Sequence, residues 1–456
     1  MRIDMFVYNR CTNDARVLKE ARTLTGAGHR VRIIAVLDAT TVPREERDGF
    51  RIVRIDRDPI HYRLLRASRR AGRLWRRPLA AMTQEESATR AVVVAAAPLA
   101  LLARGLRLLW RAGSAVSRPL KRAARRLLLT PHKPLMFFDY YRRAYRLVCA
   151  DRPDALHAHD LNTLPVAAAL ARRLRLPLTY DAHELYPEMS TLSEREAATW
   201  RWLEARLVGR ADHTLTVCDS IATEFERRYS VRRPTVLLNC PTAASANGGS
   251  AAKPAGTGPF LPHSDIEWPT DVESKVEEPV ILYQGGFSPN RGLKTLVLAA
   301  HGLERGTIVL MGWGRLEEEL RDLIAAEQLG HRVRIVDPVP PGEVIAHATR
   351  ASIGVIPYEP VGLNNTLCCP NKLFDYLAAG LPVAASRLPE LCRIVEQGEL
   401  GLTFTPGEPA ALAEAINQML ADPTRYRLMH ERAQEAARRY TWERESPKLL
   451  ALYEES

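Results

Sequence analysis

The chain has 456 residues, of which 46% are apolar, 26% charged and 7% aromatic. At about 100–200 residues per domain, this length predicts two or three domains and excludes a wholly disordered chain. The seven cysteines are odd in number and lack C-x-x-C or zinc-site spacing, which argues against a disulfide framework and favours a reducing compartment. The N-terminus lacks the long apolar core of a signal peptide, so we expect residues 1–40 to begin a folded domain.

Strands and helices alternate along the first half of the chain. An apolar strand is expected at 2–8, followed by a helix within NDARVLKEARTLTGAGH (13–29) and a strand at 31–38. Further along, the alternation continues as strand 155–160, helix 164–174, strand 177–184, helix 199–211, strand 213–219, helix 220–229 and strand 234–240. This pattern predicts a doubly wound, Rossmann-like α/β domain over residues 1–241.

The net charge of +11 is concentrated in one segment, because residues 61–150 hold 20 Lys and Arg but only three acidic residues. Within 61–135 the basic residues recur every three or four positions and alternate with Leu and Trp, which predicts amphipathic helices inserted into the first domain. Its 13-residue uncharged run is shorter than the roughly 20 residues of a membrane span. Such helices suit an anionic membrane surface better than nucleic acid, and a solvated charged face is the plain alternative.

A second alternating series follows a Gly-, Ser-, Ala- and Pro-rich segment, residues 242–278, which we expect to be a linker or loop. The series comprises strands and helices from Pro279 to residue 440, and a final amphipathic segment, 441–456, is placed to pack back on the first domain. Two Rossmann-like domains joined in this way face each other across a cleft at the carboxyl ends of their sheets, where ligands of such sheets bind.

The segment PNKLFDYLAAGLPV offers a site for a phosphate group. Pro370 is placed to start a helix, which would leave the amides of Asn371, Lys372 and Leu373 free at a positively polarised helix end. Lys372 would add a charge, and Asp375, one turn further, could accept hydrogen bonds from ribose hydroxyls. An ordinary capped helix with a surface Asp is the alternative interpretation.

Two glycine-containing turns precede this segment. In YQGGFSPNRGL a strand ends at Gly285 and Gly286, and Arg291 opens the next helix, an arrangement in which backbone and guanidinium can both contact a diphosphate. In MGWGR, Gly312 and Gly314 follow a strand and could approach a nucleoside, but the complete G-x-G-x-x-G pattern of a dinucleotide site is missing.

In the first half, HAHD (157–160) and YDAHE (180–184) each end an expected strand and therefore reach the cleft. We select His183 as the catalytic-side residue, although a histidine at a strand end is often structural. The other candidates on this side, which would face the acceptor, are Asp14, Arg16, His159, Asp160 and Glu184.

Together these segments resemble a GT-B glycosyltransferase of family 4, the retaining class, over nearly the whole chain except the basic segment and residues 242–277. The resemblance implies transfer of a sugar from a nucleotide diphosphate sugar to an acceptor, with retention of configuration and without a metal or other cofactor. It implies a donor site in the second domain, an acceptor site in the first, and a final helix that crosses back. A glycan or lipid-linked acceptor, and a cytoplasmic protein bound peripherally to the inner face of the membrane, fit the basic segment.

Residue by residue, the resemblance makes Arg291 the diphosphate contact, His183 the residue beside the transferred sugar, and Asp375 the counterpart of the ribose-binding second Glu of the family's paired-Glu motif. The chain departs from the family twice: the first Glu of that motif falls at Leu367, and the Arg after the Gly-rich turn is Phe287. Backbone donors near residues 364–366 or at position 371 are a hypothesis for what compensates. Two alternatives stay open, a GT-B sugar-nucleotide epimerase and a non-catalytic basic protein that binds membranes.

Overall fold

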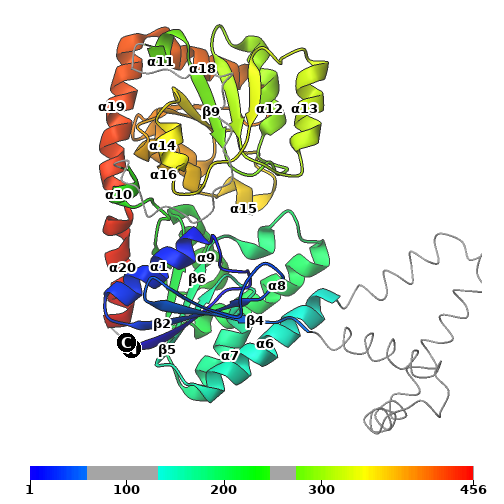
Figure 1. Cartoon of the computed structure of the whole chain (residues 1–456), viewed down its shortest axis with the longest axis vertical. Helices are drawn as coiled ribbons and strands as arrows, with labels where there is room; N and C mark the ends of the chain where they lie inside the picture. The colour runs from blue at the N-terminus through cyan, green and yellow to red at the C-terminus, as the bar shows by residue number, and fades with distance from the viewer. Residues whose placement is uncertain (59–131, 247–273, 455–456) are drawn as a thin grey trace, which may run out of the picture.

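The computed structural model describes residues 1–58, 132–246 and 274–454, and Figure 1 shows two α/β halves stacked along the long axis of the molecule. The expected fold class is confirmed, since each half is built on a largely parallel sheet with helices packed on both faces. The expected basic insertion and linker lie mostly in 59–131 and 247–273, outside the described residues. No described helix combines the length and the hydropathy needed to cross a bilayer.

The first half contains an eight-stranded sheet of order β3-β4-β2-β1-β5-β6-β7-β8, in which all neighbours are parallel except β3 and β4. Its strands are β1 (Arg2–Phe6), β2 (Arg30–Val36), β3 (Arg44–Arg47), β4 (Phe50–Ile55), β5 (Ala155–His159), β6 (Leu178–Ala182), β7 (His213–Thr216) and β8 (Thr235–Val236). The main helices of this half are α1 (Ala15–Gly26), α6 (His132–Ala150), α7 (Leu164–Leu174), α8 (Glu194–Leu207) and α9 (Asp219–Tyr229).

The second half contains a six-stranded parallel sheet of order β11-β10-β9-β12-β13-β14. Its strands are β9 (Val280–Gln284), β10 (Thr307–Met311), β11 (Val333–Val336), β12 (Ile353–Ile356), β13 (Val383–Ser386) and β14 (Gly401–Phe404). Its helices are α11 (Ser274–Glu277), α12 (Leu293–Ala299), α13 (Glu317–Ala326), α14 (Val344–Ala348), α15 (Gly362–Thr366), α16 (Asn371–Ala378), α17 (Pro389–Leu391), α18 (Pro409–Ala421) and α19 (Pro423–Arg439).

Glycine at position 354 determines how closely α16 approaches its sheet. A Cβ added at Gly354, in β12, would lie 2.4 Å from the ring of Tyr376. The hydroxyl of Tyr376 also hydrogen-bonds to the carbonyl of Leu282 (3.1 Å) and accepts the amide of Gln284 (3.1 Å) in β9. The helix that carries the expected phosphate site is therefore fixed against the centre of the second sheet.

The last helix, α20 (Trp442–Glu454), leaves the second half and packs on the first, as Figure 1 shows along one side of the molecule. Trp442 and Leu449 are buried in the same apolar cluster as Ile3 and Met5 of β1. The indole of Trp442 donates a hydrogen bond to Thr23 of α1 (2.8 Å), and the carboxylate of Glu445 accepts one from the amide of Leu238 (2.8 Å). The expected return of the chain to its first half is thus present as a packed helix.

Some elements differ from those expected. The hairpin of β3 and β4 is additional, and its turn uses Asp48 and Gly49, both at positive φ (50° and 82°). The strand expected at 234–240 is limited to Thr235–Val236, because the carbonyl of Leu237 and the amide of Leu238 hydrogen-bond to side chains instead of a neighbouring strand. Helix α8 begins at Glu194, five residues before the expected start, because Ser193 and Glu196 form a capping box there.

Candidate active site

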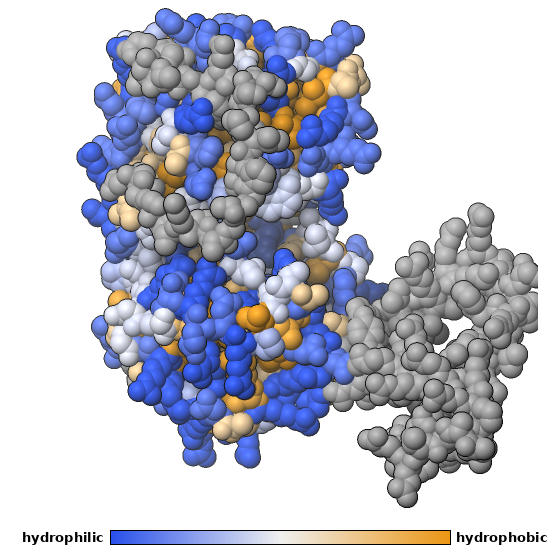
Figure 2. Space-filling model, in the orientation of Figure 1, coloured by the Kyte–Doolittle hydropathy of each residue, from blue (hydrophilic) through white to orange (hydrophobic). Residues whose placement is uncertain are grey.

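A cavity of about 480 Å³ lies between the two halves, at the carboxyl ends of both sheets. Figure 2 shows the molecular surface hollowed between its upper and lower parts. The first half contributes His183, Glu184, Val217 and Ile221 to the lining, and the second half contributes the larger share. The cleft expected from the two alternating series is therefore a real cavity with residues of both halves on its walls.

Two cations, Arg291 and Lys372, converge on this cavity. The guanidinium of Arg291 lies 4.2 Å from the ring centroid of Tyr358, and the ammonium of Lys372 lies 3.5 Å from that of Tyr283. Lys372 Nζ is buried and has no hydrogen-bond partner among the described residues. Burial, and then the nearby charge of Arg291, lower the pKa of Lys372 well below its ordinary value. An anion bound in the cavity would satisfy both cations at once.

The glycine at position 285 leaves the space in front of Lys372 open. Gly285 has φ +125°, and an added Cβ would lie 3.4 Å from Lys372 Nζ. Asn371 and Lys372 line the cavity at the start of α16. The amide of Leu373, expected to be free, instead donates to the carbonyl of Pro370 (3.0 Å), so it closes the first turn of the helix. The positive end of α16 and two cations thus face the same space.

One turn further along α16, Asp375 also lines the cavity. The side-chain amide of Gln284, the last residue of β9, donates to its carboxylate (3.2 Å). Burial raises the pKa of Asp375 to about 6, although the charges of Lys19 and Lys372 oppose this effect. Asp375 is therefore an acceptor held in place by a neighbouring amide.

The remaining glycines of the second half shape the loops around the cavity. A Cβ at Gly312 would lie 2.0 Å from the carbonyl oxygen of Gly285, and one at Gly314 would lie 2.4 Å from that of Phe287. Gly285 and Gly312 line the cavity, whereas Gly286 and Gly314 are not among its lining residues. Between the two glycines, Trp313 is 62% exposed at the rim of the cavity.

On the opposite wall, His183 is held between two carboxylates. Its Nε2 lies 2.8 Å from Asp181 Oδ2, and its Nδ1 lies 3.6 Å from Asp160 Oδ2. Burial disfavours protonation of the ring, but the charges of Asp160 and Asp181 outweigh it and raise the pKa of His183 to about 10. His183 is thus an imidazolium at neutral pH and cannot act as a general base until it loses a proton.

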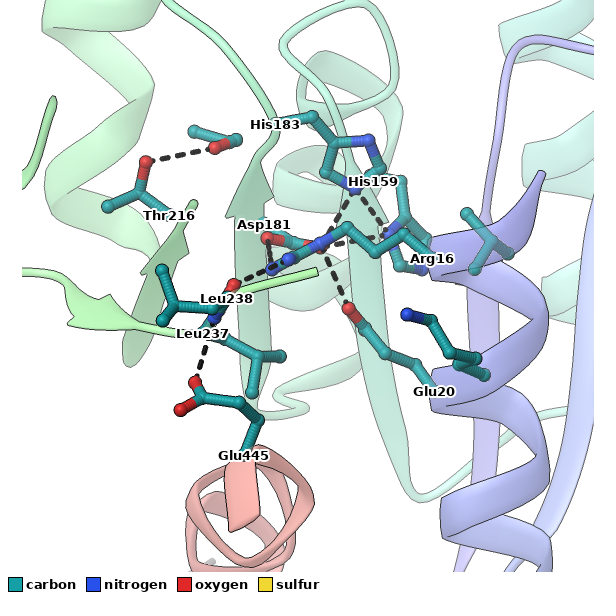
Figure 3. A network of polar contacts seen from close by, with 12 residues as sticks. Arg16, Glu20, His159, Asp181, His183, Thr216, Leu237, Leu238 and Glu445 are labelled. Atoms are coloured by element: carbon teal, nitrogen blue, oxygen red, sulfur yellow. Dashed lines mark hydrogen bonds and ion pairs between the residues drawn. The ribbon is translucent and has the colours of Figure 1, made fainter. Parts of the chain in front are cut away.

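Beneath His183 lies a buried polar network, which Figure 3 shows. Arg16 donates to both carboxylate oxygens of Asp181 (2.7 Å each) and to the carbonyl of Leu237 (2.6 Å). Burial would raise the pKa of Asp181, but Arg16 and His183 hold it well below its ordinary value. The Nδ1 of His159 lies 3.2 Å from the Nε2 of His183. The network fixes the orientation of the only ring of this group that reaches the cavity.

The same network contains side chains of a type that can bind metals. Glu20, His157, His159 and Asp181 place one potential ligand atom each within 4.8 Å of one another. The guanidinium of Arg16 contacts both acids of this group, with its Nε 3.1 Å from Glu20 Oε1. Because Arg16 already supplies a positive charge there, the donor set does not fit a further cation well.

The residues expected to face the acceptor divide into two groups. Glu184 lines the cavity, and the amide of Asn364 donates to its carboxylate across the cleft (3.1 Å). The other four residues do not line the cavity: Asp14 caps α1, Arg16 is 3% exposed, His159 is buried beneath His183, and Asp160 faces His183. Of the five residues expected to face the acceptor, only Glu184 therefore lines the cavity.

Three residues that the sequence analysis did not select belong to the site. Asp181 holds His183, Gln284 holds Asp375, and the side chain of Asn364 bridges the two halves by accepting the amide of Leu185 (2.9 Å) and donating to Glu184. Asp181 could have been selected from the sequence, because it lies in the YDAHE segment. Gln284 and the Asn364 side chain belong to no pattern that predicts these contacts.

Two α/β halves with largely parallel sheets that face each other across a cation-lined cavity, together with a final helix that crosses back, define the GT-B class of fold. The family model described as "Glycosyl transferases group 1" matches residues 278–422, and the one described as "Glycosyl transferase 4-like domain" matches residues 125–241. The chain belongs to the GT-B glycosyltransferases, in the group similar to family 4.

Among curated proteins, the chain is 27% identical over 300 residues to a glycogen synthase of Mycobacterium tuberculosis, a match that covers 64% of this chain and 65% of that protein. It is also 27% identical over 323 residues to a D-inositol 3-phosphate glycosyltransferase of Corynebacterium glutamicum, covering 66% and 72% of the two chains. The chain thus matches slightly less than two thirds of the length of the glycogen synthase.

Among solved structures, the sucrose-phosphate synthase of Thermosynechococcus elongatus is similar with a TM-score of 0.66 and 17% identity, over 100% of this chain and 98% of that one. The Anabaena protein HepE in complex with UDP-glucose gives a TM-score of 0.65 with 15% identity, over 100% of both chains. At these identities the likeness concerns the fold.

Proposed function

We propose that this protein transfers a sugar from a nucleotide diphosphate sugar to a glycan or lipid-linked acceptor, with retention of configuration. The observation that carries the proposal is the pair of basic side chains, Arg291 and Lys372, which face one cavity at the start of α16 while Nζ of Lys372 has no hydrogen-bond partner among the described residues. Burial and the nearby charge of Arg291 lower the pKa of Lys372, and a bound diphosphate would supply the opposite charge that stabilises its protonated form.

The chemistry follows from the charges on the two walls. When the bond between the anomeric carbon and the diphosphate oxygen breaks, negative charge grows on the diphosphate and positive charge on the sugar. Arg291, Lys372 and the positive end of α16 stabilise the leaving diphosphate, an electrostatic effect usually worth several kcal/mol.

Retention is consistent with attack by the acceptor hydroxyl on the face that the diphosphate leaves. Its proton passes to the departing phosphate oxygen, so no protein base is required. The state of His183 supports this route, because an imidazolium between two carboxylates offers a hydrogen bond to substrate oxygens but does not accept a proton.

The division of labour proposed for the chain assigns the acceptor to residues 1–241, the donor to 279–440 and the connection to 242–278. The concentration of Lys and Arg in 61–150 supports peripheral binding to an anionic, cytoplasmic membrane face, close to a lipid-linked acceptor. Cosedimentation with vesicles of anionic phospholipid tests this point: binding should fall with added salt and be absent with neutral vesicles, and equal binding to both would contradict it.

The main test compares donor binding and turnover in Arg291→Met and Lys372→Met with the wild type, using a panel of UDP-, GDP- and ADP-sugars. We expect each variant to lower sugar transfer about 100-fold or more, in line with the loss of a transition-state donor. Lys294→Met and Arg321→Met are matched controls, because both side chains form exposed ion pairs on α12 and α13. Wild-type transfer by the site variants, or release of an epimerised sugar nucleotide without acceptor, would refute the proposal.

A further inference from the structure

Gln284 is a polar residue in an apolar strand, at the point where β9 meets the cavity. The other residues of the strand, Val280–Tyr283, are apolar or aromatic, and all five are buried. The backbone of Gln284 is fixed, because its amide donates to the hydroxyl of Tyr376 (3.1 Å). The side chain is 4% exposed and lines the cavity. Its position is therefore set by the sheet and by α16, not by a loop.

The two polar atoms of the Gln284 side chain are used differently. Nε2 donates to Asp375 Oδ2 (3.2 Å), while the buried Oε1 has no hydrogen-bond partner among the described residues. A buried carbonyl without a donor loses the hydrogen bonds that water would give it, so a ligand hydroxyl at this place would restore one. Oε1 thus points to a ligand that donates a hydrogen bond.

The neighbouring acceptor is the carboxylate of Asp375. Because Gln284 engages Oδ2, Oδ1 is the oxygen left for a ligand, and the site presents two acceptors from two adjacent side chains. Two adjacent acceptors match two adjacent hydroxyls, each of which donates one proton. A vicinal diol has this arrangement.

The position along the cavity selects which diol. Asp375 lies one helical turn beyond Lys372, about 4.5 Å along α16. Met311, the register partner of Gln284, lines the same cavity, as do Pro338 and Val339, so the cavity also offers apolar side chains that can pack against a planar base. In a nucleotide diphosphate the ribose is the diol joined to the diphosphate, so a diol site one helical turn from the diphosphate cations corresponds to the ribose.

We propose that Gln284 completes the ribose site of the donor: its Oε1 accepts from one hydroxyl of the diol, while the carboxylate of Asp375, which the family resemblance already assigns to ribose, accepts from the other. This inference rests on the proposed function and adds a specificity-determining residue to it. The chain has a shorter acid at 375 than the Glu of its family, and the amide of Gln284 supplies the second acceptor.

The test measures discrimination between ribose and deoxyribose. Calorimetry gives the dissociation constants of UDP, 2′-deoxy-UDP and 3′-deoxy-UDP for the wild type and for Gln284→Leu, which keeps the approximate size but removes both polar atoms. We expect the wild type to bind UDP about tenfold more tightly than one of the deoxy nucleotides, the value of one good hydrogen bond. In Gln284→Leu that ratio should fall towards one.

Two further variants and a second ligand show whether a lower ratio comes from the loss of ribose recognition by Gln284 or from another cause. Gln418→Leu removes an exposed amide on α18 that bonds to Glu414, and should leave the ratio unchanged. If Gln284→Leu does not fold, Gln284→Asn retains the amide on a shorter chain and should also reduce the ratio. UDP lacks the transferred sugar. If Gln284→Leu binds UDP-glucose more weakly than the wild type does but binds UDP equally well, the diol belongs to the sugar and the inference is overturned.

The outcomes also distinguish failure of this inference from failure of the proposed sugar-transfer function. If UDP binds and the ribose-to-deoxyribose ratio is the same in Gln284→Leu and the wild type, the role of Gln284 is refuted while the donor site stands. If UDP, GDP and ADP all fail to bind the wild type, the proposed function and the inference are both refuted.

Discussion

Arg16 of α1 and Asp181 of β6 are 165 residues apart in the chain, yet the guanidinium donates two hydrogen bonds of 2.7 Å to the carboxylate. Both side chains are buried. The strand order β1-β5-β6 makes this contact natural, because α1 follows β1 and Asp181 lies near the carboxyl end of a strand only two positions away. Arg16 keeps Asp181 ionised, and the negative charge of Asp181 stabilises the imidazolium of His183.

Asp181→Asn should impair turnover without impairing donor binding. The amide has nearly the same shape but carries no charge, so it stabilises the imidazolium of His183 less, and it leaves the buried charge of Arg16 with Glu20 as its remaining carboxylate contact. We expect kcat to fall about 10- to 100-fold with little change in the Kd of UDP, together with a loss of about 3–5 kcal/mol of stability. Steady-state kinetics and urea unfolding measure the two effects. Asp48→Asn, which breaks an exposed pair with Arg22, is the control, and wild-type kcat in Asp181→Asn would contradict the positioning role.

The proton on His183 should persist well above neutral pH. Its pKa in the folded protein is raised to about 10 by Asp160 and Asp181, against about 6.5 in the unfolded chain. The stabilisation from this proton is therefore complete below pH 6.5 and disappears as the pH rises towards 10. NMR of labelled histidines should show an imidazolium signal, absent in His183→Gln, that does not titrate between pH 5 and 8. A midpoint near 6.5 would contradict this interpretation.

Asp375→Asn should make the protein more stable and less able to bind its donor. Burial raises the pKa of Asp375 to about 6 in the folded state, so folding favours the protonated form and stability falls as the pH rises from about 4 to 6. A neutral amide avoids this cost, and at pH 7 we expect a gain of up to about 3 kcal/mol. Thermal unfolding and UDP calorimetry report the two quantities. In the wild type, donor affinity should weaken as the pH falls below 6. Lower stability of the variant at pH 7 would argue against a raised pKa.

Trp442→Ala should destabilise the first half of the molecule. Trp442 is 5% exposed, hydrogen-bonds to Thr23, and lies 4.9 Å below the ammonium of Lys19. Removing a buried indole typically costs about 3–5 kcal/mol. Urea unfolding followed by circular dichroism measures this loss. Trp202→Ala is the matched control, because that ring is 55% exposed, and an equal effect of both substitutions would show that α20 does not stabilise the first half.

The fold could be predicted because the buried strands of parallel sheets appear in a sequence as continuous apolar runs. Continuous apolar runs such as VILY (280–283) alternate with segments of helical periodicity in both halves, and this alternation predicts the fold class and the position of the cleft. The β3–β4 hairpin was missed because REER carries no apolar alternation, although the Asp-Gly pair at its turn was a usable signal.

The site was predicted in part, for a physical reason. Helix starts and glycine turns can be recognised locally, so Arg291, Lys372 and Asp375 were found, and all three line the cavity. Whether a polar side chain at a strand end faces the cleft or the layer beneath depends on packing against distant elements. Arg16 and His159 were placed on the surface of the cleft for this reason, while the structure buries both. Gln284 was missed because its role depends on a helix almost a hundred residues away.

The passage of the chain back to its beginning through α20 constrains how this protein can be recombined. A fragment ending near residue 241 would lack Trp442, Leu449 and Glu445, and would expose the apolar surface of β1 and α1 that they cover. Chimeras that exchange donor specificity with relatives should therefore replace only an internal cassette and retain the recipient's own last helix. A fluorescent protein fused to the C-terminus would lie next to the first half of the molecule, although it is encoded after the second half.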